Sequence, residues 1–123
     1  MNFNTVHPAL EFVCPFCKEQ LTSGVGFRLG AILRLNYQMG DELIWRGGEC
    51  RPESKPPQCD FKTVGYFNCD NPACSTWTDC FPEVQHALVT VRDNRIVSVE
   101  GYELPSDGDV VEFAILEMPE DCT

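Results

Sequence analysis

Two pairs of closely spaced cysteines, far apart in the chain, constrain its fold more than any other feature. The first pair is Cys14 and Cys17, and the second is Cys69 and Cys74. Each pair encloses a short segment that contains a proline, and a tight turn of this length lets two thiolates reach one metal ion. Because four thiolates complete the tetrahedron of a zinc ion, the spacing predicts a structural zinc site. Such a site would tie the start of the chain to its middle.

The second pair leaves the identity of the fourth ligand undecided. Its cysteines are separated by four residues, and Cys80 follows Cys74 after five more, so Cys80 is an alternative fourth ligand. An iron–sulfur cluster also accepts four cysteines, although neither common ferredoxin spacing is present. A thioredoxin-like dithiol is disfavoured, because residues 18–24 are too few for the helix that follows such a motif. Zinc is therefore the cofactor that we predict.

Whether the remaining cysteines form disulfides or stay reduced depends on the cellular compartment. The sequence shows no signal-peptide pattern at its start and no apolar run long enough to cross a membrane. We therefore expect a cytoplasmic protein with no membrane partner, where paired cysteines bind metals more often than they form disulfides. Cys50 and Cys59 are expected to be free thiols or a pair that oxidation closes, and Cys122 is expected to be free.

Negative charge is concentrated near the end of the sequence. The formal net charge is −10, and residues 96–123 contain eight acidic residues with no lysine or arginine. Such a surface repels phosphate backbones and attracts basic partners, although the charge alone also favours solubility. We therefore predict a basic protein as the partner and expect no nucleic acid. The predicted partner-binding residues are Glu100, Glu103, Asp107, Asp109 and Glu112.

The hydrophobic pattern is typical of a mainly β protein. A length of 123 residues fits a single domain over residues 1–123. Apolar and β-branched residues alternate in a series of short segments between turn-forming residues. We predict strands at residues 9–13, 24–38 with a bulge or bend at Gly30 and Ala31, 42–45, 61–68, 84–92, 95–102 and 109–116. Residues 46–60 are rich in proline and glycine and are expected to form an exposed, flexible loop.

A hairpin is the clearest local prediction. Asp93 and Asn94 tolerate positive φ and suit a two-residue turn between the strands at 84–92 and 95–102. The expected cross-strand pairs are Val91 with Ile96, Thr90 with Val97, and Leu88 with Val99. Both faces then carry aliphatic side chains, one against the core and the other covered by protein or left as a binding patch. The predicted fold is a small antiparallel sheet with a zinc-ribbon core built from two cysteine knuckles.

Several segments resemble a known group of proteins. The motif Cys14-Pro-Phe-Cys17, the stretch at 35–43, the second cysteine pair and the hairpin at 89–100 are similar to small bacterial zinc-ribbon proteins of uncharacterised function. The similarity covers about residues 12–100. As a type, a small acidic protein of this kind also resembles the immunity proteins of bacterial toxin systems. That resemblance implies a protein that acts by binding and inhibiting another protein.

Catalytic chemistry is not predicted. Only His7 and His86 offer imidazoles, and no nucleophile elbow, phosphate-binding glycine loop or His-Glu-x-x-His motif is present. Four thiolates would also leave no open position on the metal. We therefore predict a non-enzymatic zinc protein without a small-molecule substrate, acting as an immunity-type or antitoxin-type inhibitor of a basic toxin or enzyme.

The alternative is a zinc-ribbon module that binds nucleic acid or the transcription or translation machinery. Basic residues that fall in one half of the chain favour it. They are Arg28, Arg34, Arg46, Arg51, Lys55 and Lys62.

Overall fold

The computed structural model describes residues 3–7, 12–21, 24–52, 60–75, 77–78, 81–82 and 84–117. These residues contain strands and turns but no helix, which confirms the mainly β class. The strands are β1 (Asn4–His7), β2 (Val25–Phe27), β3 (Gly30–Ala31), β4 (Asn36–Gln38), β5 (Cys50–Arg51), β6 (Phe61–Phe67), β7 (Trp77–Thr78), β8 (Phe81–Pro82), β9 (Gln85–Arg92), β10 (Arg95–Tyr102) and β11 (Ile115–Glu117).

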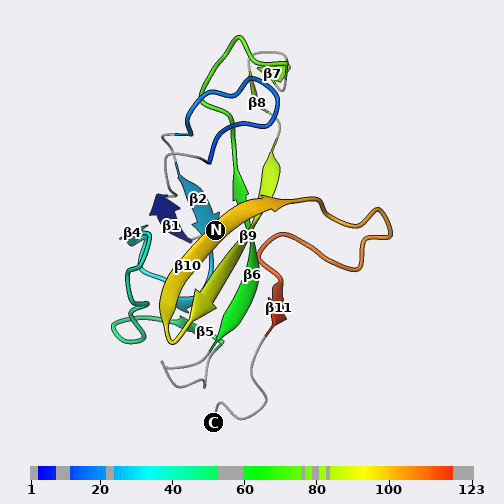
Figure 1. Cartoon of the computed structure of the whole chain (residues 1–123). Helices are drawn as coiled ribbons and strands as arrows, with labels where there is room; N and C mark the ends of the chain where they lie inside the picture. Colours follow the sequence, from blue (N-terminus) through cyan, green and yellow to red (C-terminus); the bar gives the residue numbers. More distant parts are fainter. Residues whose placement is uncertain are drawn as a thin grey trace.

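Seven of these strands form one curled sheet (Figure 1). Its order is β10-β9-β6-β2-β1-β4, and β11 pairs with the same edge of β6 as β2 does, nearer the start of β6. All pairs are antiparallel except β1 with β4, which are parallel. The sheet is therefore mixed, which corrects the prediction of a purely antiparallel sheet. Two short ladders, β3 with β5 and β7 with β8, stand apart from it.

Strand β1 was not predicted, because a polar side chain occupies one of its two inward positions. Asn4 and Val6 are both fully buried, whereas Thr5 and His7 are half-buried. Because Asn4 is polar, the buried positions of β1 do not show the alternation of apolar and polar residues that predicts a strand. The amide of Asn4 has polar partners in the segment between β2 and β4, which compensates for its burial.

Strand β6 occupies the centre of the sheet. All seven of its residues pair with β9, from Phe61 opposite Val91 to Phe67 opposite Gln85. On its other edge a Cβ at Gly65 would lie 2.6 Å from the carbonyl oxygen of Gly26, so only glycine permits this approach of β2. The predicted strand at 61–68 is thus confirmed to within one residue.

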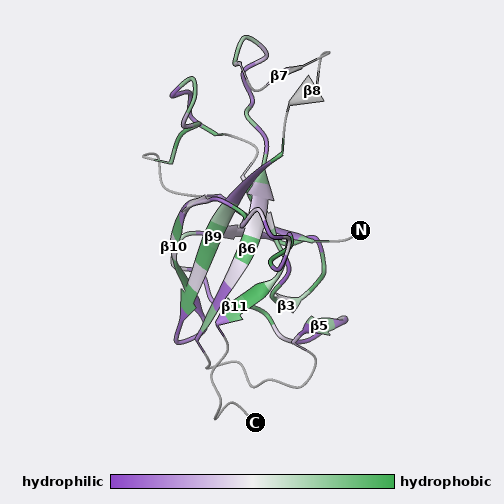
Figure 2. Ribbon diagram, turned by 90° about the vertical axis from the view of Figure 1, so that its right-hand side faces the viewer, coloured by the Kyte–Doolittle hydropathy of each residue, from purple (hydrophilic) through white to green (hydrophobic). Residues whose placement is uncertain are grey.

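Hydrophobic side chains cover both faces of the sheet. Figure 2 shows hydrophobic stretches along β9 and β11. The main core contains fully buried side chains from β1, β2, β6, β9 and β10, including Val6, Phe27, Phe61, Val89 and Ile96. A separate aromatic group contains Phe3, Tyr66 and Phe113, whose ring centroids lie 5.2–6.2 Å apart. The residues after β10 therefore return to pack against β6.

The β9–β10 hairpin has the predicted turn but not the predicted register. Asp93 and Asn94 have φ angles of 49° and 66°, and Val91 faces Ile96 as expected. A bulge between Ile96 and Ser98 then inserts one extra residue in β10. Thr90 consequently faces Ser98 and Leu88 faces Glu100, so the predicted partners Val97 and Val99 were wrong by one position.

Positive φ angles interrupt two other predicted strands. The strand expected at 24–38 is divided into β2, β3 and β4, because Gly30 and Arg34 have φ angles of 73° and 57°. The strand expected at 109–116 was largely wrong, because Phe113 has a φ of 67° and pairing in β11 begins at Ile115. The strand expected at 42–45 is reduced to a single bridge between Glu42 and Arg95.

Two further predictions are only partly described by the structure. Residues 9–11 of the strand expected at 9–13 lie outside the described residues, and Val13 forms one bridge with Gln20. The loop expected at 46–60 contains the short strand β5, which pairs with β3, so its first part is not a simple flexible loop. Residues 53–59 of that loop, including Cys59, and Cys122 also lie outside the described residues.

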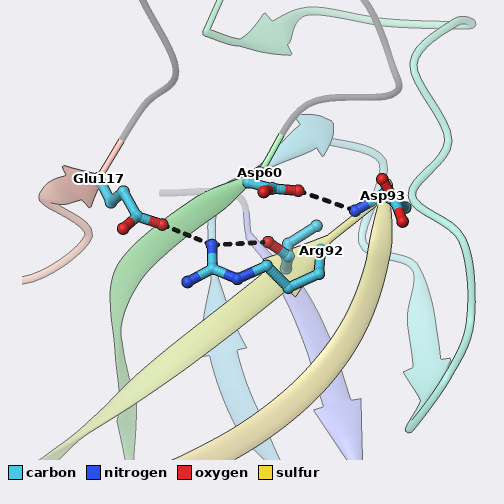
Figure 3. Close-up of polar contacts among 5 residues, drawn as sticks. Asp60, Arg92, Asp93 and Glu117 are labelled. Carbon is cyan, nitrogen blue, oxygen red and sulfur yellow. Dashed lines mark hydrogen bonds and ion pairs between the residues drawn. The ribbon is translucent and has the colours of Figure 1, made fainter.

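Polar contacts join the tip of the β9–β10 hairpin to β11 and to the residue before β6 (Figure 3). Arg92 of β9 forms an ion pair with Glu117 of β11, and the carboxylate of Asp60 accepts the backbone N–H of Asp93 at 2.9 Å. The ion pair is exposed to solvent, so we expect it to contribute at most about 1 kcal/mol. These contacts fix the tip at the end of β6 opposite to Cys69.

A candidate four-cysteine metal centre

The two cysteine pairs meet beyond the end of β6. Strand β6 ends at Phe67, two residues before Cys69, and the loop that carries Cys14 lies beside the loop that follows β6 (Figure 1). All four Sγ atoms lie within 4.8 Å of one another: Cys14, Cys17, Cys69 and Cys74. The structure therefore brings together the four predicted ligands as a possible metal site. Cys80, the alternative ligand, lies outside the described residues.

The distances between the sulfurs suit ligands of one ion. Sγ of Cys14 lies 3.7 Å from Sγ of Cys74, and Sγ of Cys17 lies 3.5 Å from Sγ of Cys69. A tetrahedron with metal–sulfur distances of about 2.3 Å has edges of about 3.8 Å. A disulfide would require about 2.05 Å. The arrangement can thus accept a tetrahedral metal ion with small adjustments.

The first knuckle is a tight turn closed by backbone hydrogen bonds. The N–H of Cys14 donates to the carbonyl of Glu19 at 3.0 Å, and the N–H of Lys18 donates to the carbonyl of Cys14 at 2.9 Å. Lys18 has a φ of 65°, which turns the chain back after Cys17. The turn places the thiols of Cys14 and Cys17 on the same side, toward the second pair.

The second knuckle accommodates its longer spacer through Asn71. The N–H of Asn71 donates to Sγ of Cys69 at 3.4 Å, and its side-chain oxygen accepts the N–H of Ala73 at 3.0 Å. The backbone carbonyl of Asn71 accepts the N–H of Cys74 at 2.9 Å. An asparagine that bonds to the backbone two residues later forms a compact turn, so four intervening residues still bring the thiols together.

Trp77 and Gln85 support the cysteines and were not predicted. The indole N–H of Trp77 donates to the carbonyl of Cys69 at 2.9 Å, and its backbone N–H donates to the carbonyl of Cys74 at 3.0 Å. The side-chain amide of Gln85 approaches Sγ of Cys14 at 3.8 Å. Gln85 belongs to β9 and reaches the site only because it is paired with Phe67. That register cannot be derived from the spacing of the cysteines.

Different hydrogen bonds make the ionisation of these buried thiols unequal. Cys14, Cys69 and Cys74 are buried, and Cys17 is half-buried. Burial and the neighbouring thiols raise the pKa of Cys69 to about 12. Burial also opposes the ionisation of Cys14, but hydrogen bonds from the backbone of Cys17 and Phe16 and from Gln85 outweigh it, and the pKa of Cys14 is lowered. Four adjacent thiolates require a cation to compensate their charge.

The predicted partner-binding carboxylates lie mostly on a segment that projects from the sheet. Figure 1 shows the residues between β10 and β11 extending to one side. Four of the predicted residues are exposed: Glu100, Glu103, Asp107 and Asp109. Glu112 is half-buried, and its carboxylate lies 3.7 Å from Nε2 of His86. The structure therefore leaves four of the five carboxylates accessible to a partner.

The basic residues of the alternative function are less accessible as a group. Arg28 and Arg51 are half-buried, and Arg51 donates to the carbonyl of Phe113 at 3.4 Å. Burial and the proximity of Arg28 lower the pKa of Arg51. Arg34 and Arg46 are exposed, whereas Lys62 is half-buried. Lys55 lies outside the described residues.

Comparison with known proteins does not identify a family. No family model, curated protein or solved structure gives a significant match to the chain. Among the described residues, no helix is long and apolar enough to span a membrane.

Proposed function

We propose that this protein is a non-enzymatic zinc protein that inhibits a basic toxin or enzyme by binding to it in a reducing compartment. Its zinc site is structural, with Cys14, Cys17, Cys69 and Cys74 as ligands. The observation that carries the zinc assignment is the convergence of these four sulfurs within 4.8 Å, three of them on buried residues. Four thiolates around zinc would leave no position for a substrate or a reactive water molecule.

The metal can be identified directly. We expect the protein purified from a reducing cytoplasm to contain one zinc ion per chain and to be colourless, because Zn²⁺ has a filled d shell. Cys14→Ser should reduce the bound zinc to below half, whereas Cys50→Ser should not change it. A coloured protein that contains iron and sulfide would contradict the zinc assignment in favour of a cluster.

The partner is inferred from charge. The chain carries a net charge of −10, and zinc bound to four thiolates would retain two further negative charges. Glu100, Glu103, Asp107 and Asp109 place part of this charge at the surface. A basic partner would therefore be attracted over about 10 Å in moderate salt, and its association would slow as ionic strength rises. An immunity-type inhibitor of a basic toxin fits these properties.

The partner test uses the full chain isolated from its native cells. We expect one basic protein to co-purify with it and to bind more weakly as salt is raised. Asp109→Lys should weaken this binding at least five-fold, whereas Glu49→Lys, the same charge change beside β5, should have less effect. Binding to DNA or RNA at low salt without a protein partner would favour the zinc-ribbon module that binds nucleic acid.

A further inference from the structure

Strand β10 has a partly open edge. It is the end strand of the sheet and pairs with β9 on one side. On the other side the N–H of Ile96 donates to Asp41 and its carbonyl accepts from Gly40, at 3.1 and 2.8 Å. Beyond Ile96, no described residue forms a backbone hydrogen bond with this outer edge.

The register shows which backbone groups point outward. In an antiparallel pair, residues with backbone bonds to the partner strand alternate with residues whose N–H and C=O point away from it. Arg95 closes the two-residue turn opposite Arg92. If Arg95 bonds to Arg92, the alternation continued past the bulge makes Ser98, Glu100 and Tyr102 the next residues of β10 whose backbone groups bond to β9. Val99 and Gly101 therefore present their N–H and C=O groups on the open edge.

A groove runs along the same edge. A hollow of about 460 Å³ is lined by residues 97–101 of β10 together with Phe12 and Met39. A second hollow, of about 750 Å³, continues from Gly101 past Leu104 along the first knuckle. The two adjoin at Phe12 and Gly101, which line both, and together we call them the β10 groove.

The β10 groove exposes apolar side chains beside open backbone groups. Phe16 is 63% exposed at one end, and Val97 is 49% exposed at the other. A Cβ added at Gly101 would meet no atom within 4 Å, so the middle of the groove is open. Backbone groups of an edge strand flanked by apolar surface are the features by which sheets bind an extended peptide as an additional strand.

The negative charge along the β10 groove indicates which kind of molecule would bind there. Glu100 and Glu103 are exposed along the groove, and the side chain of its one lysine, Lys18, donates to the carbonyl of Pro15 at 2.9 Å. A second copy of this chain is disfavoured, because antiparallel pairing through residues 99 and 101 would place Glu100 opposite Glu100. Like charges directly opposite each other destabilise a sheet, and both copies carry a net charge of −10.

We propose that the β10 groove binds an extended, basic segment of the partner protein as an added β-strand. The partner's backbone would bond to Val99 and Gly101, while its lysine or arginine side chains would approach Glu100 and Glu103. This proposal rests on the proposed inhibitor function and specifies its contact surface. Burial of Phe16 and Val97 would add a hydrophobic contribution.

The test uses a synthetic eight-residue peptide that alternates lysine and valine, with a glutamate–valine peptide as its charge control. Gly101→Pro removes the outward N–H without removing a bond to β9, and proline is tolerated in edge strands. Gly101→Ala is the matched control, because it retains the N–H and adds one methyl group in open space. Thermal unfolding and zinc content of each variant verify the fold.

We expect the lysine–valine peptide to bind to the wild-type protein and to Gly101→Ala, and to bind at least ten-fold more weakly to Gly101→Pro. The glutamate–valine peptide should not bind. Equal binding to Gly101→Pro and Gly101→Ala, or no binding at millimolar peptide, would overturn the proposal, as would dimerisation of the wild-type chain that Gly101→Pro abolishes. If the co-purified partner still binds Gly101→Pro in a salt-sensitive manner, the inhibitor function stands and only this contact surface is wrong.

Discussion

Asn4 has both atoms of its side-chain amide engaged although the residue is fully buried. Its nitrogen donates to the carbonyls of Leu29 and Ala31 at 3.1 and 3.0 Å, and its oxygen accepts the N–H groups of Leu33 and Leu35 at 3.3 and 3.0 Å. One side chain thus fixes the irregular backbone between β2 and β4. A satisfied polar group of this kind specifies a single arrangement of a core.

We predict that Asn4→Leu destabilises the protein by at least about 2 kcal/mol, because it leaves several backbone groups without partners. Chemical denaturation of the metal-loaded protein measures the change in the free energy of unfolding. Asn36→Ala is the control, since Asn36 is exposed and its side-chain oxygen lies 3.3 Å from Nε2 of His7 rather than in a buried network. Equal losses in the two variants would show that the buried network is not needed.

Tyr37 is expected to make the protein less stable at alkaline pH. Its hydroxyl accepts the N–H of Ile44 at 3.1 Å, and burial together with Asp41 raises its pKa above the ordinary value of 10.0. The native state therefore favours the neutral phenol. This contribution to stability is complete below about pH 10 and is lost as pH rises through the native pKa.

We predict that Tyr37→Phe is less stable than the wild type near neutral pH by about 1 kcal/mol, because the N–H of Ile44 loses its acceptor. The difference should shrink above pH 10, where the wild type alone must ionise this phenol or unfold. The free energy of unfolding, measured for both proteins from pH 8 to 11, follows the difference. A constant gap across this range would contradict the prediction. Tyr66, whose pKa is also raised, is present in both proteins.

The β9–β10 turn shows that an element can be stabilised by contacts beyond its own residues. The side-chain oxygen of Asn94 accepts the indole N–H of Trp45 at 2.6 Å, and its nitrogen donates to the carbonyl of Leu43 at 3.1 Å. The carbonyl of Asn94 accepts the N–H of Leu43 at 2.9 Å. The turn therefore also holds residues 43–45, which do not form the predicted strand.

We predict opposite effects of glycine at the two turn positions. Asp93→Gly should be neutral or stabilising by up to about 1 kcal/mol, because glycine adopts positive φ without strain. Asn94→Gly should destabilise by about 1–3 kcal/mol, because Trp45 and Leu43 lose side-chain partners even though the turn itself improves. Thermal unfolding of the two variants compares them. If Asn94→Gly were the more stable variant, the contacts to 43–45 would be unimportant.

The sequence predicts elements where local chemistry decides the structure and fails where a distant contact does. Asp93 and Asn94 predict their turn because few residues accept positive φ. The bulge after Ile96 is hidden, since Val97 and Val99 are both aliphatic and either register buries a hydrophobic residue. The central strand is predicted well because its aromatic and β-branched residues favour a strand locally, and all seven of its residues then pair with β9.

At the scale of the whole molecule, the cysteine pairs connect the first loop to the end of the central strand. Their meeting could be predicted, because thiol spacing reflects the geometry of metal binding. Their supports could not, since Gln85 approaches Cys14 only through the pairing of β9 with β6. Asn71 was equally hidden, because its role depends on a turn conformation that many asparagines do not adopt.

We predict that removal of the metal destabilises the entire fold, because metal-binding energy contributes to folding energy when ligands come from distant segments. Cys14→Ser should lower the free energy of unfolding by at least about 3 kcal/mol or prevent cooperative unfolding. Cys50→Ser should cost less than about 1 kcal/mol, since its thiol donates to the carbonyl of Trp45 at 3.1 Å, outside the cluster. Thermal unfolding of the two variants, with and without a chelator, measures these changes in stability.

Similar melting of Cys14→Ser and Cys50→Ser, with and without chelator, would show that the sheet is stable without the metal. The cluster would then be local to the two loops.

The first knuckle contributes to two sites at once. Its turn holds Cys14 and Cys17 in the candidate metal centre, and Phe16, between them, forms part of the wall of the β10 groove. Because zinc is expected to stabilise the whole fold, a chain without zinc would lose the position of that wall together with the stability of the sheet behind it. The availability of zinc in the cell would then set how much of the protein is competent to neutralise its target.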